Sequence, residues 1–172
     1  IAFHLPSTKQ DLESLAAINL INEVLFSNSG RLTRLLKDEL LLVESIGGDG
    51  EMRKDPGIEV ISARLRKGAS LTAVIDSVYS ALRVISSTPI SDEELDRARN
   101  NSRARMIFGL NSPSRIASSL GVHRVINDDY RTLMKLFELY ASVSAEKIRS
   151  LASEVFAPTN RTVVTLVPKS GI

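Results

Sequence analysis

Residues 26–48 read FSNSGRLTRLLKDELLLVESIGG, and this stretch decides how the rest of the chain is interpreted. It opens with a polar turn at residues 27–30, continues into a short predicted helix from Arg31, and contains the apolar run LLLV at residues 40–43. An apolar run of this length next to turn residues predicts a strand buried on both faces, here extending to Ile46. The later helices are expected to cover that strand.

Length and composition fit an ordinary globular domain. At 172 residues the chain is long enough for one domain with a real core. Ile1 already belongs to a strand pattern, so we expect residues 1–172 to be a single domain cut from a larger two-domain protein. The net charge of +2 is too small to indicate nucleic acid or an anionic membrane as a partner.

Residue usage also excludes cysteine-based sites and membrane-spanning helices. Cysteine is absent, so the chain has no disulfide, no thiolate zinc site and no cysteine nucleophile. No apolar run approaches the roughly 18–20 residues that a membrane-spanning helix requires.

Periodicity along the chain predicts the remaining elements. Alternation of apolar residues predicts strands at 1–5, 57–66 and 162–167, and the glycines at 47, 48 and 50 predict a turn. Helical spacing combined with capping residues predicts helices beginning near Thr8, Ser70, Ser91, Ser112, Asp128 and Ser144. In the first of these, Asp11 is expected at the N3 position of a capping box.

Two of the predicted helices carry apolar faces that we expect to be buried. They are Ile116, Ala117 and Leu120 on one helix, and Tyr130, Leu133, Phe137 and Tyr140 on the next.

The order of elements predicts an α+β fold. The second and third strands follow one another with no helix between them, so we expect a hairpin joined by a loop of about ten residues. An antiparallel or mixed sheet, packed on one face by several helices, accommodates this order.

The residues alone show no active site. His4 and His123 lack zinc-site spacing, and H-x-x-E-H is absent. Both are interpreted as surface or partly buried structural histidines. A hydrolase that uses His4 or His123 is left open, although no G-x-S-x-G elbow supports it. The arginines between Arg97 and Arg105 form either a nucleic-acid stripe or a solvated helix face, and their acidic neighbours favour the latter.

Six stretches, in the same order along the chain, resemble the insulinase-like zinc metallopeptidases, the family of pitrilysin and mitochondrial processing peptidase. They are FHLP at 3–6, DLESL at 11–15, GRLTRLL at 30–36, ISDEELDRA at 90–98, VSAEKI at 143–148 and FAPTNRTVV at 156–164. The fourth fits the family's Ile-Ser-x-x-Glu-Leu-x-x-Ala helix start. The similarity is strongest to short, bacterial-type members. Because H-x-x-E-H is absent, the chain resembles their inactive C-terminal half-domain.

The resemblance implies a half-clamshell domain that does not catalyse on its own. It implies no cofactor in this chain, with zinc held by a partner catalytic half-domain in the same chain or a separate subunit. The parent polypeptide would be a zinc metalloendopeptidase, and this half would form part of the substrate chamber and bind extended peptide or the catalytic half. The alternative is a non-proteolytic scaffold or adaptor of the same fold. A soluble location, the bacterial periplasm or cytoplasm, is expected.

The candidate substrate-binding residues are Arg31 and Arg64. Some family members contact substrate through an Arg and a Tyr of the inactive half, but Ile58 and Glu59 stand where the Arg is expected, and no Tyr follows before Tyr79. The family's Gly-Leu-x-Tyr aromatic is also missing, with Glu44 near its position. Arg31 has a second interpretation, as a residue of helix entry and local packing. An exposed sheet edge offers another way to bind peptide, by adding a strand.

Overall fold

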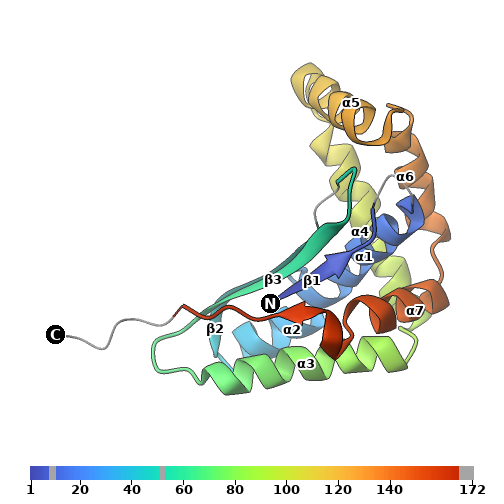
Figure 1. The fold of residues 1–172 in the computed structure, drawn as a ribbon. Helices are drawn as coiled ribbons and strands as arrows, with labels where there is room; N and C mark the ends of the chain where they lie inside the picture. The colour runs from blue at the N-terminus through green and yellow to red at the C-terminus, as the bar shows by residue number, and fades with distance from the viewer. Residues whose placement is uncertain (8–10, 51–52, 167–172) are drawn as a thin grey trace.

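The structure is a computed structural model that describes residues 1–7, 11–50 and 53–166. Figure 1 shows its elements in chain order: β1 (Ala2–Leu5), α1 (Leu12–Phe26), α2 (Arg31–Thr33), the π-helix η1 (Arg34–Glu39), β2 (Val43–Gly50), β3 (Gly57–Leu65), α3 (Leu71–Ser87), α4 (Asp92–Gly109), α5 (Pro113–Asn127), α6 (Thr132–Ser142), α7 (Ala145–Val155), the 3-10 helix η2 (Pro158–Asn160) and β4 (Arg161–Thr162).

The strands of the described chain form one antiparallel sheet in the order β2-β3-β1-β4. β2 and β3 are the predicted hairpin, with Gly47 opposite Ser62 and Gly50 opposite Glu59. The hairpin connection spans residues 51–56, which is shorter than predicted. This arrangement confirms the α+β fold with an antiparallel sheet.

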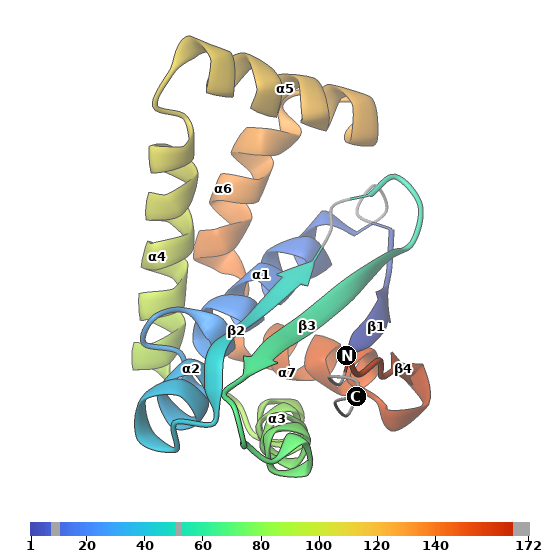
Figure 2. The same ribbon diagram turned by 90° about the vertical axis from the view of Figure 1, so that its left-hand side faces the viewer.

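The helices cover one face of the sheet and leave the other uncovered (Figure 2). Alternation along the strands shows the same division, since Phe3 and Ile61 are buried whereas His4 and Ile58 are exposed. α1 lies at the centre of the core, in contact with β2, α4, α6 and α7. Its residues Ala16 to Ile18 are fully buried, as its wide apolar surface predicts.

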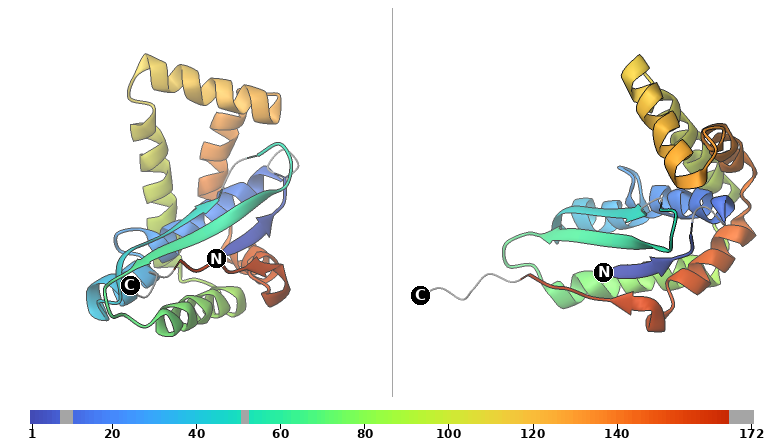
Figure 3. Two further views of the ribbon diagram at one scale, coloured as in Figure 1. Left: turned by 60° about the vertical axis from the view of Figure 1, so that its left-hand side comes forward. Right: turned by 45° about the horizontal axis from the view of Figure 1, so that its top comes forward.

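A helical arm projects from this body. Figure 3 shows α4 and α6 extending beyond the sheet, with α5 crossing their far ends. The main contacts of α5 are with α6. The prediction that Ile116, Ala117 and Leu120 face a core is wrong, because the first two are exposed and the third is only half-buried. No neighbouring element covers that side of α5 within the described part of the chain.

The predicted apolar stripe of α6 is half right. Leu133 and Tyr140 are buried, Phe137 is half-buried beneath the Arg103 guanidinium, and Tyr130 is exposed. None of the helices in the described ranges is long and apolar enough to cross a bilayer.

The prediction of a strand buried on both faces at residues 40–46 is wrong, because one face of the sheet is uncovered and only Val43 is buried within β2. Leu40 and Leu41 are 50% and 54% exposed, and β2 begins only at Val43. The N–H groups of Leu40 and Leu42 bond to carbonyls of η1, so the apolar run first serves as a helix end. Leu41 then turns the chain with a positive φ of 53°. The predicted turn at Gly47, Gly48 and Gly50 is also wrong, because these residues lie inside β2.

Most predicted helix starts are confirmed by side-chain caps. Ser70, Ser91, Ser112 and Ser144 each accept a hydrogen bond from the backbone N–H three residues later. Thr8 lies outside the described residues, and Asp11 is itself the N-cap of α1 instead of its N3 residue.

Two boundaries differ from prediction. Asp128 ends α5 in a left-handed conformation (φ 60°), and α6 begins at Thr132. The predicted last strand, 162–167, has ladder partners only at Arg161 and Thr162 within the described chain. Val164 and Leu166 beyond it are 83% and 100% exposed.

Candidate functional site

β2 forms one edge of the sheet. The directions of its backbone N–H and C=O groups can be worked out from the hydrogen bonds that join its neighbour β3 to the N-terminal end of the chain beside β1. Ile61 and Ile1 exchange two N–H···O bonds, each 2.8 Å between nitrogen and oxygen. The backbone groups of Ile61 therefore point toward β1. Because these groups alternate in direction along a strand, those of Val60 and Ser62 point toward β2.

The outward-facing groups of β2 are those of Ile46, Gly48 and Gly50. Val60 pairs with Asp49 and Ser62 pairs with Gly47, so the backbone groups of Asp49 and Gly47 point toward β3. The backbone groups of the residues that alternate with them along β2 point away from β3. No other element of the described chain bonds to the backbone of these three residues. The outer edge of β2 is thus free to pair with a further extended strand.

Close packing on the helix-covered face disfavours a side chain at two glycines of this edge. A Cβ on Gly48 would lie 2.5 Å from Asn22 Oδ1 and 2.6 Å from the Phe26 ring. A Cβ on Gly50 would lie 2.6 Å from Glu59 Oε2. A Cβ on Gly47, which points to the uncovered face, would meet no atom within 4 Å.

A buried carboxyl group lies beneath the edge. Glu59 is fully buried, and its Oε2 accepts one hydrogen bond, from Asn22 Nδ2 at 3.3 Å. Its Oε1 and the Asn22 Oδ1 have no hydrogen-bond partner in the described structure. Burial raises the pKa of Glu59 to about 7, and the nearby Asp49 carboxylate acts in the same direction. Glu59 is therefore largely protonated below neutral pH.

A pocket of about 410 Å³ opens beside the edge, between β2 and the arm. Gly48 and Gly50 form one wall with Asn19 and Asn22 of α1. The other walls come from α4, α5 and α6, and include Ser102, Met106, Ser119, His123, Leu133, Leu136 and Tyr140.

The polar groups of this pocket are only partly hydrogen-bonded. Tyr140 is 7% exposed and its hydroxyl accepts from Asn19 Nδ2 at 2.8 Å. His123 is 4% exposed and its Nδ1 lies 3.4 Å from Asn127 Oδ1. Burial lowers the pKa of His123, so its ring is neutral at pH 7.

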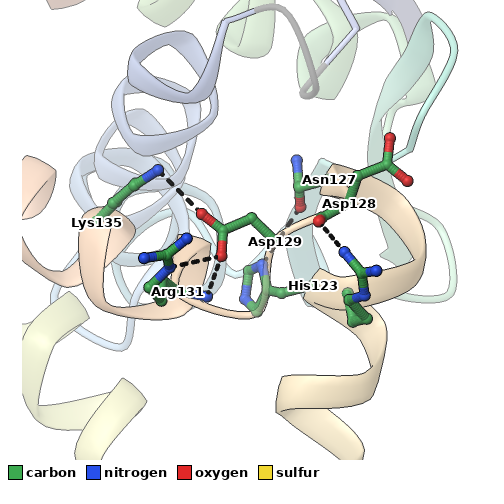
Figure 4. A network of polar contacts seen from close by, with 7 residues as sticks. His123, Asn127, Asp128, Asp129, Arg131 and Lys135 are labelled. Atoms are coloured by element: carbon green, nitrogen blue, oxygen red, sulfur yellow. Dashed lines mark hydrogen bonds and ion pairs between the residues drawn. The ribbon is translucent and has the colours of Figure 1, made fainter.

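A network of polar contacts holds the turn between α5 and α6. Figure 4 shows the Asp129 carboxylate accepting bonds from the Arg131 backbone N–H (3.0 Å), Arg131 Nε (3.1 Å) and Lys135 Nζ (3.2 Å). These donors, the backbone N–H first, lower the pKa of Asp129 to about 2. Arg124 donates to the Asp128 carbonyl in the same turn.

The two arginines chosen from the sequence lie apart from each other. Arg31 forms a two-point ion pair with Glu94 of α4, with Nε–Oε1 at 2.8 Å and Nη2–Oε2 at 2.5 Å. Arg64 lies on the uncovered face of β3, where its Nε is 2.9 Å from Glu44 Oε2 and its side chain is 80% exposed. Arg31 is thus engaged by Glu94, whereas the Arg64 side chain is exposed on the strand next to β2.

The histidines also lie apart, with His4 exposed on β1 and His123 buried in the arm. Among residues 1–7, 11–50 and 53–166, no three His, Cys, Asp or Glu side chains come together in a way that could hold a metal ion. The described residues of this chain therefore do not fit a zinc site.

Sequence reasoning missed the edge glycines, Glu59 and the pocket. The glycine cluster at 47–50 reads as a turn, because the atoms that exclude a side chain there belong to α1 and β3. A charged residue flanked by Ile58 and Val60 inside a predicted strand is the one signal that could have pointed to Glu59.

Comparison with known proteins identifies related chains. A family model described as the Peptidase M16 inactive domain matches residues 1–102. No curated protein matches the chain at a significant level.

Solved structures share the fold over nearly the whole chain. The inactive peptidase domain of a proposed zinc protease from Bordetella parapertussis is 22% identical with a TM-score of 0.85, covering 98% of this chain and 90% of that one. A proposed zinc protease from Bordetella pertussis Tohama I is 22% identical with a TM-score of 0.82, covering 98% and 92%. A protease from Helicobacter pylori is 19% identical with a TM-score of 0.83 over 92% of this chain, which spans only 38% of that protein.

Proposed function

The chain belongs to the family of M16 peptidase inactive domains, and from this premise we propose that it is the non-catalytic half of a zinc-dependent peptidase. Zinc and the catalytic residues would belong to a partner half-domain, in the same polypeptide or another subunit. The Helicobacter pylori protease, which is much longer than this chain, is consistent with a second half. The uncovered face of the sheet would form part of the substrate chamber.

The peptide-binding element in this proposal is the outer edge of β2. The backbone groups of Ile46, Gly48 and Gly50 point outward with no partner in the described chain, which supports pairing with an extended peptide. Main-chain pairing binds many sequences, as a peptidase substrate chamber requires. This free edge is the observation that carries the proposal.

Gly47 adds independent support. Unlike Gly48 and Gly50, it has room for a Cβ with no neighbouring atom within 4 Å, so packing among the described residues does not explain why glycine stands there. A glycine inside a strand often marks the close approach of another backbone. A peptide backbone lying over the uncovered face of β2 would make that approach, because the missing Cβ of Gly47 points to that face.

Arg31 and Arg64 remain proposed substrate contacts within this function. Arg64 is exposed on the uncovered face, one strand in from the edge, where it could meet an acidic group of a bound peptide. Arg31 could meet such an acidic group only with the part of its guanidinium that is not bonded to Glu94. Its side chain is 33% exposed.

Backbone methylation of a peptide tests the edge directly. An extended peptide should bind, and N-methyl groups on every second residue should abolish binding when those amides face β2. Methylation of the other set, which faces away, should leave the affinity nearly unchanged. The affinities would be measured by fluorescence anisotropy. If the two sets of N-methyl groups lowered the affinity equally, strand addition would be ruled out.

A scaffold or adaptor of the same fold would also bind peptide, so a second assay is needed. The full parent polypeptide should hydrolyse peptides and lose that activity with a chelator. Binding without chelator-sensitive hydrolysis would favour the scaffold.

A further inference from the structure

We propose that the pocket between β2 and the arm receives an aromatic side chain with a hydrogen-bonding tip, that of Tyr or Trp, from a peptide paired with β2. This inference rests on the proposed function and adds the class of side chain that the edge selects. It assigns to the helical arm a role in peptide selection.

The pocket and the edge share residues. Gly48 and Gly50, whose backbone groups form the free edge, also form a wall of the pocket. Side chains of an extended peptide alternate between the two faces of the sheet it joins. Every second side chain would therefore point to the helix-covered side, where α1 and the arm enclose the pocket.

The size of the pocket suits one large side chain. Its volume of about 410 Å³ lies near the lower end of the range for ligand sites, roughly 300–1,000 Å³. Gly48 and Gly50 place no side chain in it. A whole peptide segment would not fit, whereas a single aromatic ring would.

The walls favour an apolar body with one polar tip. Met106, Leu133 and Leu136 supply apolar surface. Three buried polar residues line the same space, namely Ser102, His123 and Tyr140. The Tyr140 hydroxyl accepts from Asn19 Nδ2, and Asn22 Oδ1, from another lining residue, is a buried acceptor with no hydrogen-bond partner in the described chain. Buried polar groups normally have hydrogen-bond partners, and a Tyr hydroxyl or a Trp N–H can supply one.

A charged occupant is disfavoured. Arg105 lines the pocket but already bonds to Glu23, a carboxylate only 5% exposed. Asp49 lies at the rim and is exposed to solvent. His123 is neutral at pH 7. No buried charge among the described lining residues is left to compensate a buried Lys or Glu side chain.

Peptides differing at one position test this. We would measure the affinity of the protein for an otherwise Ala/Thr octapeptide with Tyr, Trp, Phe or Ala at its centre. The Tyr and Trp peptides should bind at least about ten-fold more tightly than the Ala peptide, because the ring fills the pocket and the tip completes its hydrogen bonds. The Phe peptide, which has the ring without the tip, should have an intermediate affinity.

Two matched variants locate the preference. Ser119→Trp fills the pocket from α5. It should lower the affinity for the Tyr peptide to that for the Ala peptide, and it should leave the affinity for the Ala peptide unchanged. Ser118→Trp, on the exposed side of the same helix, should leave the preference intact. Equal affinity of the Tyr, Phe and Ala peptides, or a preference that survives Ser119→Trp, would overturn the pocket assignment alone. Failure of every peptide to bind would overturn the β2 edge and this inference with it.

Discussion

At the scale of single residues, Glu59 makes the stability of the fold depend on pH. Burial raises its pKa from 4.5 to about 7, so the carboxyl is protonated in the folded protein where it would be ionised in the unfolded chain. The free energy of unfolding should therefore fall as the pH rises from about 4.5 to about 7, and level off above. The shift converts to roughly 2–4 kcal/mol.

Glu59→Gln should remove this dependence, because a neutral amide occupies the same space. We expect the variant to be more stable than the native protein at pH 8 and similar at pH 4.5, measured by urea unfolding. Asp49→Asn is the matched control, since it changes an exposed carboxylate beside the same site and should keep most of the slope. An unchanged pH profile in Glu59→Gln would contradict the assignment.

The pair Arg31–Glu94 is a second prediction at this scale. The bonds to Glu94 raise the pKa of Arg31, and those to Arg31 lower that of Glu94. The two side chains are 33% and 22% exposed, so solvent weakens the pair, and a double-mutant cycle should give a coupling of about 1 kcal/mol.

Peptide affinity separates the two roles of Arg31. If Arg31 also contacts substrate, Arg31→Ala weakens peptide binding while Glu94→Ala, which frees the guanidinium, does not. Equal peptide affinity in both variants would leave Arg31 with packing alone.

At the scale of elements, the end of η1 stores backbone strain at Leu41. A non-glycine residue with φ of 53° costs roughly 1–2 kcal/mol unless its side chain tolerates that region, as Asn does. Leu41→Asn should raise the free energy of unfolding by about 0.5–1 kcal/mol, measured in denaturant. Leu40→Asn is the control, because Leu40 is equally exposed but has a φ of −87°. Equal changes in the two variants would refute the strain argument.

Local signals explain which elements the sequence could predict. The caps at Ser70 and Ser144 depend on residues three positions away, so the corresponding helix starts were predictable. The start of β2 was not, because LLLV suits both a buried strand and a helix end. The glycines of β2 were misread because contacts with Asn22 and Glu59, distant in sequence, impose them.

At the scale of the whole molecule, the fold and family were predictable from ordered motifs along the chain, whereas the pocket was not. Its lining comes from β2 and four helices, and no single stretch of sequence encodes it. α5 shows the limit most clearly. Apolar residues occur all around it, which is typical of a buried helix, yet it crosses the end of the arm with most of its surface exposed.

This exposure predicts unequal local stability. α5 has its main contacts with α6 alone, whereas α1 contacts β2, α4, α6 and α7. Amide hydrogen exchange should therefore be faster in residues 113–127 than in residues 12–26, since local opening of α5 breaks few buried contacts. Because Ser119 and His123 of α5 line the pocket, a bound Tyr peptide should slow exchange in α5, and an Ala peptide should slow it only in β2. Mass spectrometry of the free and bound protein distinguishes these patterns. Protection confined to β2 with both peptides would mean that the arm takes no part in peptide selection.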